Sequence, residues 1–249
     1  RSNNRPPTLC CVREDEIPAG ACVMRSTGIC KYKFTNGVFE KCKYRLCCDG
    51  STQVQGETYD KTFACTVQPS TLRMCIGLAN EYDMCCHSGD YCQAFLQGDP
   101  DFTMYMQFPE EIINNKHFHN ENITSNSVRC DGLLYGAKQA PRRFAEAQTA
   151  NLEKVGFVQS QVDPCLYHFW EESKGAWIMV LVYVDDVVVI ADNTAQVDWV
   201  YEQIRTEFEV DDMGPIDFYL GMKFTRDWER GTFRVDQSSF IEKIINSHP

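Results

Sequence analysis

The strongest pattern in the chain is a pair of apolar, β-forming runs on either side of two acids. Residues 177–192 read WIMVLVYVDDVVVIAD, and branched and aromatic residues dominate both runs. This pattern predicts two strands, 177–184 and 187–191, joined as a hairpin with Asp185 and Asp186 at its tip. Shorter runs of the same kind predict strands at 91–96, 164–170, 217–224 and 231–236.

A second hairpin is expected in residues 29–48, because the turn signal Thr35-Asn36-Gly37 divides this stretch into two strand-like halves. Helices are expected where apolar residues recur every three or four positions. One begins at Pro69, a second follows Pro141 and runs to Phe157, and residues 239–245 start another. The expected buried faces of the first helix and of a helix near residue 200 are Leu72, Cys75, Ile76, Ala79 and Tyr82, and Val197, Val200, Tyr201, Ile204 and Phe208.

The mixture of antiparallel strands and a few packed helices predicts an α+β fold. The Asn-rich residues 110–128 are expected to form a loop. The 249 residues are 43% hydrophobic and 24% charged, as in globular proteins, and no apolar stretch reaches the 18 residues of a membrane helix. Because the chain begins RSNNRPP, without Met or an apolar leader, we interpret it as a segment of a longer protein.

The net charge of −11 weighs against nucleic-acid binding, because phosphates are bound by Lys and Arg. The charge is uneven, however: residues 1–92 carry eleven basic and ten acidic residues, whereas residues 93–249 carry thirteen and twenty-five. An acidic half of this kind is compatible with a divalent-metal site. The charge therefore does not decide the question.

Fourteen cysteines are present, twelve of them between Cys10 and Cys92, but the chain contains no C-x-x-C. Three states remain open: reduced thiols, a disulfide framework and a zinc site. The length and the ordinary core composition favour reduced thiols, because disulfide frameworks belong mostly to short secreted chains.

Asp185 and Asp186 are the first candidate functional residues. An Asp-Asp pair is a poor two-residue hairpin turn, and adjacent carboxylates beside apolar strands repel each other. Divalent cations would compensate for both costs; the alternative is an ordinary solvated turn. Asp90, ahead of another apolar stretch, is either a turn residue or a third carboxylate. Three such acids suit two-metal phosphoryl transfer, in which the ions lie about 4 Å apart.

Taken together, several blocks of the chain resemble the reverse transcriptase of copia-type LTR retrotransposons. The resemblance runs from about Ile17 to the end. The blocks, in order, are DYCQAFLQG, MYMQFPEE, LLYGAKQAPRRF, GFVQSQVDPCLYH, LVYVDDVVVIAD, FEVDDMGPIDFYLGMKF and DQSSFIEKII.

This resemblance implies a right-hand polymerase made of fingers and palm, with an antiparallel palm sheet packed on helices and with the thumb missing. The fingers would comprise residues 1–66 and 99–143, and the palm residues 67–98 and 144–249. The implied activity is that of an RNA- and DNA-directed DNA polymerase, a nucleotidyltransferase that joins a dNTP to a primer 3′-hydroxyl. The implied cofactor is Mg²⁺, as two ions, with Mn²⁺ as a substitute.

The resemblance also implies roles for individual residues. Asp90, Asp185 and Asp186 would be the catalytic, metal-binding carboxylates, with the backbone carbonyl of Tyr91 as a further metal contact. Lys43 and Arg45 would bind the triphosphate of the nucleotide. The remaining implied roles are sugar selection by Phe95, nucleotide contact by Gln139, and primer contact by Tyr183, Gly221 and Met222. Without the resemblance, these side chains would be read as core, cap or surface residues.

The implied partners are an RNA or DNA template with its primer, dNTPs and the rest of the Pol polyprotein, namely thumb, connection and RNase H. No membrane partner is expected. The implied location is the cytoplasm, within particles, with the nucleus as the alternative.

The chain also departs from the family pattern. Gly28 stands where the family usually has Trp, Tyr91 follows the first aspartate where Val is usual, and KYRLCC replaces KARLVA. Loss of a buried Trp costs about 3–5 kcal/mol. Two explanations follow: a decayed, catalytically dead copy or polymerase-like binding module, and a divergent lineage with compensating contacts. The cysteine pairs leave a third hypothesis, a metal- or redox-responsive protein.

Overall fold

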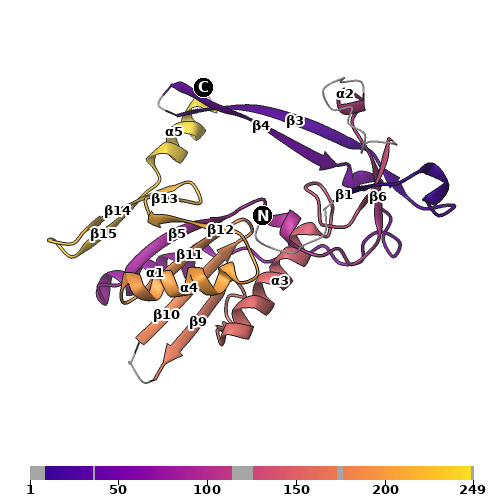
Figure 1. Cartoon of the computed structure of the whole chain (residues 1–249). Coiled ribbons are helices and arrows are strands. Elements are labelled where there is room, and N and C mark those ends of the chain that lie inside the picture. Colours follow the sequence, from indigo (N-terminus) through magenta and orange to yellow (C-terminus); the bar gives the residue numbers. More distant parts are fainter. Residues whose placement is uncertain (1–8, 36, 114–125, 173–175, 248–249) are drawn as a thin grey trace. The chain divides into compact units, whose positions relative to one another are not determined.

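The computed structural model describes residues 9–35, 37–113, 126–172 and 176–247 (Figure 1). The chain forms two compact units, and each is built from two separate segments: residues 1–64 and 94–146 in unit 1, and residues 65–93 and 147–249 in unit 2. Helices and sheets occur in both, so the expected α+β class is confirmed. Within the described ranges, no helix is long and apolar enough to cross a membrane.

Unit 2 is built on a six-stranded antiparallel sheet, with the strands in the order β12-β5-β11-β10-β9-β8. The expected strands at 164–170, 177–184 and 187–191 are confirmed as β9, β10 and β11. The strand bounds are β5 (Cys85–Tyr91), β8 (Val158–Gln159), β9 (Leu166–Glu171), β10 (Ala176–Tyr183), β11 (Asp186–Ala191) and β12 (Val210–Pro215).

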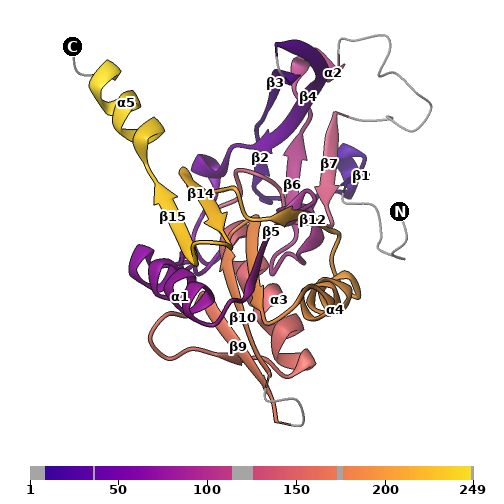
Figure 2. The ribbon, with the colours of Figure 1, turned by 90° about the vertical axis from the view of Figure 1, so that its left-hand side faces the viewer.

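Helices cover both faces of this sheet. Figure 2 shows α1 (Pro69–Glu81) and α4 (Thr194–Arg205) on opposite sides of it. The apolar face of α1 packs with Val188 and Ile190 of β11, but Tyr82, expected on that face, lies beyond the helix end and is exposed. On the other side, the hydroxyl of Tyr201 in α4 lies 2.7 Å from where a Cβ of Gly89 would be. The third expected helix is α3 (Ala140–Val155), and the expected terminal helix is α5 (Ser238–Ser247).

A small three-stranded sheet of β13 (Phe218–Tyr219), β14 (Met222–Asp227) and β15 (Thr232–Asp236) completes unit 2. The expected single strand 217–224 is wrong. Leu220 and Gly221 have φ of 49° and 78° and form a two-residue turn that splits it. Two consecutive positive φ values are typical of a type I′ hairpin turn, for which glycine is suited at the second position.

Unit 1 holds a four-stranded sheet in the order β1-β7-β6-β2, in which only the β2–β6 pairing is parallel. Its core contains Met24, Met104, Met106 and Leu133. The expected loop 110–128 instead includes α2 and the start of β7, while residues 114–125 lie outside the described residues. The bounds are β1 (Leu9–Cys11), β2 (Val23–Met24), β6 (Met104–Gln107), α2 (Glu110–Ile113) and β7 (Ser127–Cys130).

A long two-stranded ribbon, β3 (Ser26–Thr35) and β4 (Val38–Cys48), confirms the hairpin expected at 29–48 (Figure 1). Asn36 at its tip lies outside the described residues. Directly paired residues project to the same face of the ribbon, and successive residues along each strand alternate between its two faces. One carries Lys31, Lys33, Lys41, Lys43 and Arg45, and the other carries Tyr32, Phe34, Phe39 and Tyr44.

The expected strand at 91–96 is wrong. The strand is β5, which ends at Tyr91, and residues Ala94–Gln97 form a 3₁₀ turn. The segment CCHSGDY has weak β-propensity, and it is extended because it pairs with β11 on one side and with β12 on the other. Asp90 therefore lies near the end of an internal strand of the sheet rather than just before a strand, as expected.

Candidate active site

Three carboxylates form a row across neighbouring strands of the unit 2 sheet. Asp90 of β5 is paired directly with Asp186 of β11 on one side and with Asp211 of β12 on the other. Residues that are directly opposed in a ladder project from the same face of a sheet. The row therefore brings Asp90 and Asp186 together, as the sequence predicts, and adds Asp211.

The hairpin turn next to this row is Val184-Asp185, not Asp185-Asp186 as expected, because Tyr183 and Asp186 pair across it. Val184 has a φ of 55°, a left-handed conformation that is strained for a β-branched residue. Two hydrogen bonds hold the turn: the Tyr91 N–H donates to the Asp185 carbonyl (2.8 Å), and Gln148 Nε2 donates to the Val184 carbonyl (3.1 Å). The turn is thereby tied to β5, on which Asp90 lies.

The surroundings of Asp186 disfavour its negative charge. Burial, followed by the charges of Asp90 and Asp185, raises the pKa of Asp186 to about 6. In the part of the chain that the structure describes, no lysine or arginine forms an ion pair with Asp90 or Asp186. The hydroxyl of Tyr219 is buried without a hydrogen-bond partner, and burial together with the charge of Asp186 raises its pKa. Among the described residues, the Asp90–Asp186 pair therefore has no basic ion-pair partner.

This donor set fits hard divalent cations. Carboxylate oxygens are the ligands that Mg²⁺ prefers, and nearby cations favour the ionised form of each acid. Among the described residues, no three His, Cys, Asp or Glu side chains converge closely enough to hold a metal ion by themselves. That is compatible with Mg²⁺, which is commonly bound by one or two carboxylates, with waters and substrate phosphates completing its shell.

Asp211 is the site residue that the sequence analysis missed. Its carboxylate accepts a hydrogen bond from Cys92 Sγ (3.3 Å). Burial and this hydrogen bond raise the pKa of Cys92 to about 11. The sequence marks Asp211 only by the acid pair in FEVDDMG. No strand is expected there, because the residues of β12 have little apolar character.

Tyr91 contributes to the site only through its backbone, because its ring is buried. The ring packs edge-on against Phe208, with 5.8 Å between centroids, and its hydroxyl is hydrogen-bonded to Gln148. The aromatic residue that replaces the family's Val thus has a filled pocket of its own on the face opposite to the acids.

The residues implied for primer contact also lie in unit 2. Tyr183 ends β10, directly opposite Asp186, and is half-buried. Gly221 is exposed in the β13–β14 turn, whereas the side chain of Met222 is buried in the core. Met222 thus presents only its backbone toward a partner.

The other implied site residues lie in unit 1. Lys43 and Arg45 are exposed on the cationic face of the ribbon, and the Arg45 guanidinium lies 5.7 Å from the centroid of the Tyr135 ring. Phe95 is half-buried against Tyr135 and Phe144, with ring centroids 4.8 and 6.2 Å away. These contacts fix the orientation of the Phe95 ring.

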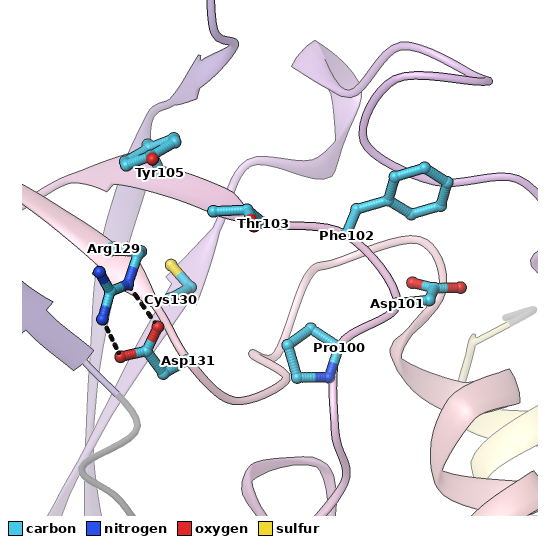
Figure 3. Close-up of a pocket in the computed structure, with 8 residues that line it drawn as sticks. All are labelled: Pro100, Asp101, Phe102, Thr103, Tyr105, Arg129, Cys130 and Asp131. Atoms are coloured by element: carbon cyan, nitrogen blue, oxygen red, sulfur yellow. Dashed lines mark hydrogen bonds and ion pairs between the residues drawn. The ribbon is translucent and has the colours of Figure 1, made fainter. Parts of the chain in front are cut away.

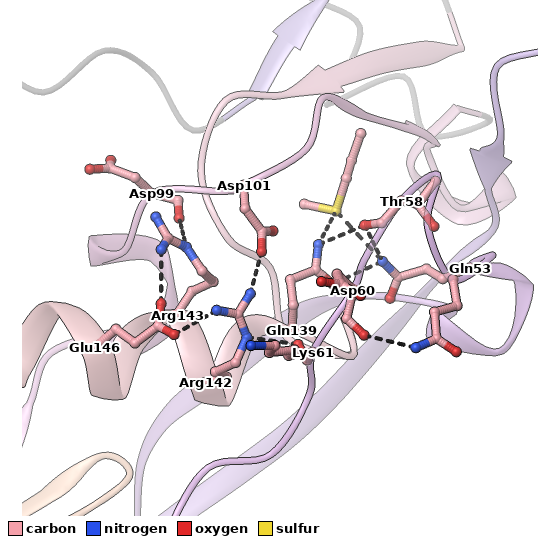
Figure 4. Close-up of polar contacts among 12 residues, drawn as sticks. Gln53, Thr58, Asp60, Lys61, Asp99, Asp101, Gln139, Arg142, Arg143 and Glu146 are labelled. Carbon is pink, nitrogen blue, oxygen red and sulfur yellow. Dashed lines mark hydrogen bonds and ion pairs between the residues drawn. The ribbon is translucent and has the colours of Figure 1, made fainter.

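Gln139 is completely buried in unit 1. Its Nε2 donates to the Thr58 carbonyl (3.0 Å), and its Oε1 accepts from Gln53 Nε2 (2.9 Å) (Figure 4). On the following turn of α3, Arg142 is paired with Asp101 and Glu146. Direct contact between Gln139 and a nucleotide would require its present hydrogen bonds to break.

Unit 1 also contains an open cavity of about 510 Å³ next to the ion pair of Arg129 and Asp131 (Figure 3). Pro100, Phe102 and Thr103 line its other side. None of the residues that the sequence analysis selected lines this cavity.

Comparison with known proteins identifies the family to which this chain belongs. Residues 16–248 match the model of the family "Reverse transcriptase (RNA-dependent DNA polymerase)", and the chain belongs to that family. The resemblance to copia-type retrotransposon enzymes is thereby confirmed.

Three relatives specify the relationship further. The chain is 27% identical over 234 residues to the Retrovirus-related Pol polyprotein from transposon TNT 1-94 of Nicotiana tabacum, covering 92% of this chain and 17% of that protein. It is 27% identical over 202 residues to the Retrovirus-related Pol polyprotein from transposon RE2 of Arabidopsis thaliana, and the match covers 79% of this chain and 13% of that polyprotein. The putative transposon Ty5-1 protein YCL074W of Saccharomyces cerevisiae is 28% identical to this chain over 157 residues. That match covers 63% of this chain and 48% of the yeast protein. The chain thus spans less than a fifth of the two plant polyproteins.

Proposed function

We propose that the chain is the polymerase portion of a retrotransposon polyprotein and extends a primer on an RNA or DNA template. The observation that carries this proposal is the acid row. Asp90 and Asp186 are cross-strand neighbours beside the strained turn that holds Asp185, and no basic residue of the described chain is paired with Asp90 or Asp186. In this proposal unit 2 is the palm and unit 1 the fingers.

The chain's own residues divide the work. Asp90, Asp185 and Asp186, with the Tyr91 carbonyl, would hold two Mg²⁺ ions, or Mn²⁺ in their place. Bound there, such ions lower the pKa of the primer 3′-hydroxyl and stabilise the negative charge of the pyrophosphate leaving group. The hydrogen bonds of the Val184-Asp185 turn to Tyr91 and Gln148 hold Asp185 beside the strands that carry Asp90 and Asp186.

Residues of unit 1 would select the nucleotide. Lys43 and Arg45 are exposed cations suited to a triphosphate. Phe95 is oriented by two rings, as expected of a residue that tests the shape of a sugar. Gln139 would act through the Gln53–Thr58 network, and Tyr183, Gly221 and Met222 would contact the primer.

The proposal extends to the partners named in the sequence analysis: template with primer, dNTPs and the remaining domains of a Pol polyprotein. Particles in the cytoplasm, or the nucleus, are the proposed location. The alternative is a catalytically dead remnant or binding module, favoured by the departures at Gly28, Tyr91 and the KYRLCC block.

Primer extension by the full chain tests the proposal, with RNA and DNA templates and with Mg²⁺ or EDTA. The wild-type chain should extend the primer only with the metal. Asp185→Asn should lower the rate at least about 100-fold, because loss of a metal-held carboxylate removes several kcal/mol of transition-state stabilisation. Asp192→Asn, an exposed acid just past the opposite end of β11, is the matched control and should retain full activity. No extension by the wild-type chain, or equal rates for Asp185→Asn, would support the dead-copy alternative.

A further inference from the structure

Two cysteines of the β3–β4 ribbon are in contact on the surface. Cys30 Sγ and Cys42 Sγ lie 2.9 Å apart. All fourteen cysteines lie in the described residues, and all are free thiols. Cys30 and Cys42 are the two that are exposed; the other twelve are buried or half-buried. The most accessible thiols of the chain are therefore adjacent to each other.

The register of the ribbon explains this contact. Cys30 pairs with Tyr44, and Tyr32 pairs with Cys42, so the two cysteines are diagonal neighbours on the aromatic face. The right-handed twist of a two-stranded ribbon shortens one diagonal. The contact thus follows from the pairing of β3 (10 residues) with β4 (11 residues), which continues on both sides of Cys30 and Cys42.

We propose that Cys30 and Cys42 form a redox modification site, in which a low-molecular-weight disulfide such as glutathione disulfide converts the two thiols into a reversible disulfide. An S–S bond is about 2.05 Å long, so the sulfurs need to approach by only about 0.9 Å from their present 2.9 Å separation. Side-chain rotation supplies such a movement without breaking the ladder.

Glutathione disulfide would oxidise the two cysteines in two thiol–disulfide exchange steps. The thiolate of one cysteine attacks a sulfur of glutathione disulfide, forming a mixed disulfide and releasing one glutathione thiolate. The thiolate of the second cysteine then attacks the protein sulfur of that mixed disulfide and releases the second glutathione. Two cysteine thiols are oxidised, one glutathione disulfide is reduced to two glutathione thiols, and the two cysteine protons pass to those thiols.

Other thiols are poorer candidates. Cys48, Cys86 and Cys130 are buried, which keeps the reagent away and raises the pKa of each to about 12. The hydrogen bond with Cys30 also raises the pKa of Cys42, but Cys42 is exposed to the reagent. Cys65 and Cys165 are hydrogen-bonded to each other, but Cys165 is buried. They form the rival pair, and the experiment must distinguish the two.

The consequence of the disulfide would be local. The bond would join β3 to β4 within the ribbon that carries Lys43 and Arg45, so an oxidising environment would alter the strand pair on which those cations lie. The disulfide itself does not depend on polymerase activity, and its test uses no polymerase readout.

Peptide mapping of the oxidised full chain tests the site. The chain is incubated with glutathione disulfide, free thiols are blocked, and trypsin is added without reductant. Residues 26–31 (STGICK) should be recovered linked to residues 42–43 (CK). This link should form at least about tenfold faster than any other, because it needs no unfolding, and dithiothreitol should reverse it.

Two variants sharpen the result. Cys30→Ser should leave Cys42 as a mixed disulfide with glutathione, with no intramolecular link at this position. Cys22→Ser is the matched control, because Cys22 is half-buried and donates a hydrogen bond to the Thr52 carbonyl (3.3 Å). In this variant, the disulfide between Cys30 and Cys42 should form as in the wild-type chain. Circular dichroism checks that both variants fold. Separate capping of Cys30 and Cys42 by glutathione, or faster linkage of Cys65 to Cys165, would overturn the proposal.

Discussion

Asp186 is the residue at which stability and the proposed chemistry conflict most directly. Its carboxylate is half-buried, lies opposite Asp90 and follows Asp185 in sequence. Burial and these two charges raise its pKa to about 6. Strongly perturbed carboxyl groups of this kind concentrate at functional sites, where repulsion in the free protein becomes attraction for a cation.

We expect Asp186→Asn to stabilise the metal-free chain at neutral pH. A carboxyl group whose pKa rises on folding, here from 3.8 to about 6, binds its proton more tightly in the folded chain. The wild-type chain therefore loses stability as the pH rises from about 4 to above 6, whereas the Asn side chain does not ionise. The variant should gain about 2 kcal/mol in unfolding free energy at pH 7.5 and nothing near pH 4.

Urea unfolding in EDTA at several pH values measures this difference. Asp192→Asn, an exposed acid just past the end of the same strand, should show no gain that grows with pH. A variant that is less stable than the wild-type chain at pH 7.5 would contradict the electrostatic account of the row.

At the scale of elements, the ribbon shows how a departure from the family pattern is accommodated. Tyr44 lies over Gly28, and its hydroxyl oxygen is 1.7 Å from the position that a Cβ of Gly28 would occupy. Gly28 stands where the family usually has Trp, and Tyr44 stands where KARLVA has Ala. The two departures meet at one position, and we interpret this pair as divergence with compensation rather than as decay.

A double-mutant cycle on the ribbon tests that interpretation. Gly28→Trp should destabilise unit 1 because the new ring collides with Tyr44, and Tyr44→Ala should destabilise it because the backbone at Gly28 loses its cover. The double variant restores the family pattern and should recover stability, with a coupling energy of at least about 1 kcal/mol. Gly28→Trp combined with Tyr32→Ala, on the same face but outside this contact, should be additive. Additive effects in the first pair would favour the decayed-copy hypothesis.

The elements that the sequence predicted are those whose own pattern is strong. β10, β11 and α4 carry long apolar periodicities, and the residues that α4 buries are those expected. β5 was missed because CCHSGDY is held extended by pairing on both sides, which is a tertiary effect.

The same reasoning applies to the site. Asp90 and Asp186 were identified from the sequence, but their direct pairing and the partnership with Asp211 depend on strand register, which no local pattern specifies. The turn was misplaced by one residue because Val184 adopts a φ that its side chain disfavours. The burial of Gln139 depends on long-range hydrogen bonds to Gln53, Thr58 and Met104, which no local pattern specifies.

At the scale of the whole molecule, the proposed metal ions would reconcile the charge of −11 with the family membership. A nucleic-acid enzyme with an acidic second half needs local positive charge at its acids, and Lys43 and Arg45 lie in the other unit. Divalent ions at Asp90, Asp185 and Asp186 would supply that charge. The account therefore depends on metal binding by this row.

The most direct test is a titration of the full chain with Mn²⁺, followed by electron paramagnetic resonance of the free ion. The wild-type chain should bind Mn²⁺, bind it more tightly when a dNTP supplies phosphate oxygens, and release it to excess Mg²⁺. Asp90→Asn combined with Asp186→Asn should abolish this binding, and Asp192→Asn should leave it unchanged. Equal Mn²⁺ binding by the double variant and the wild-type chain would contradict the account.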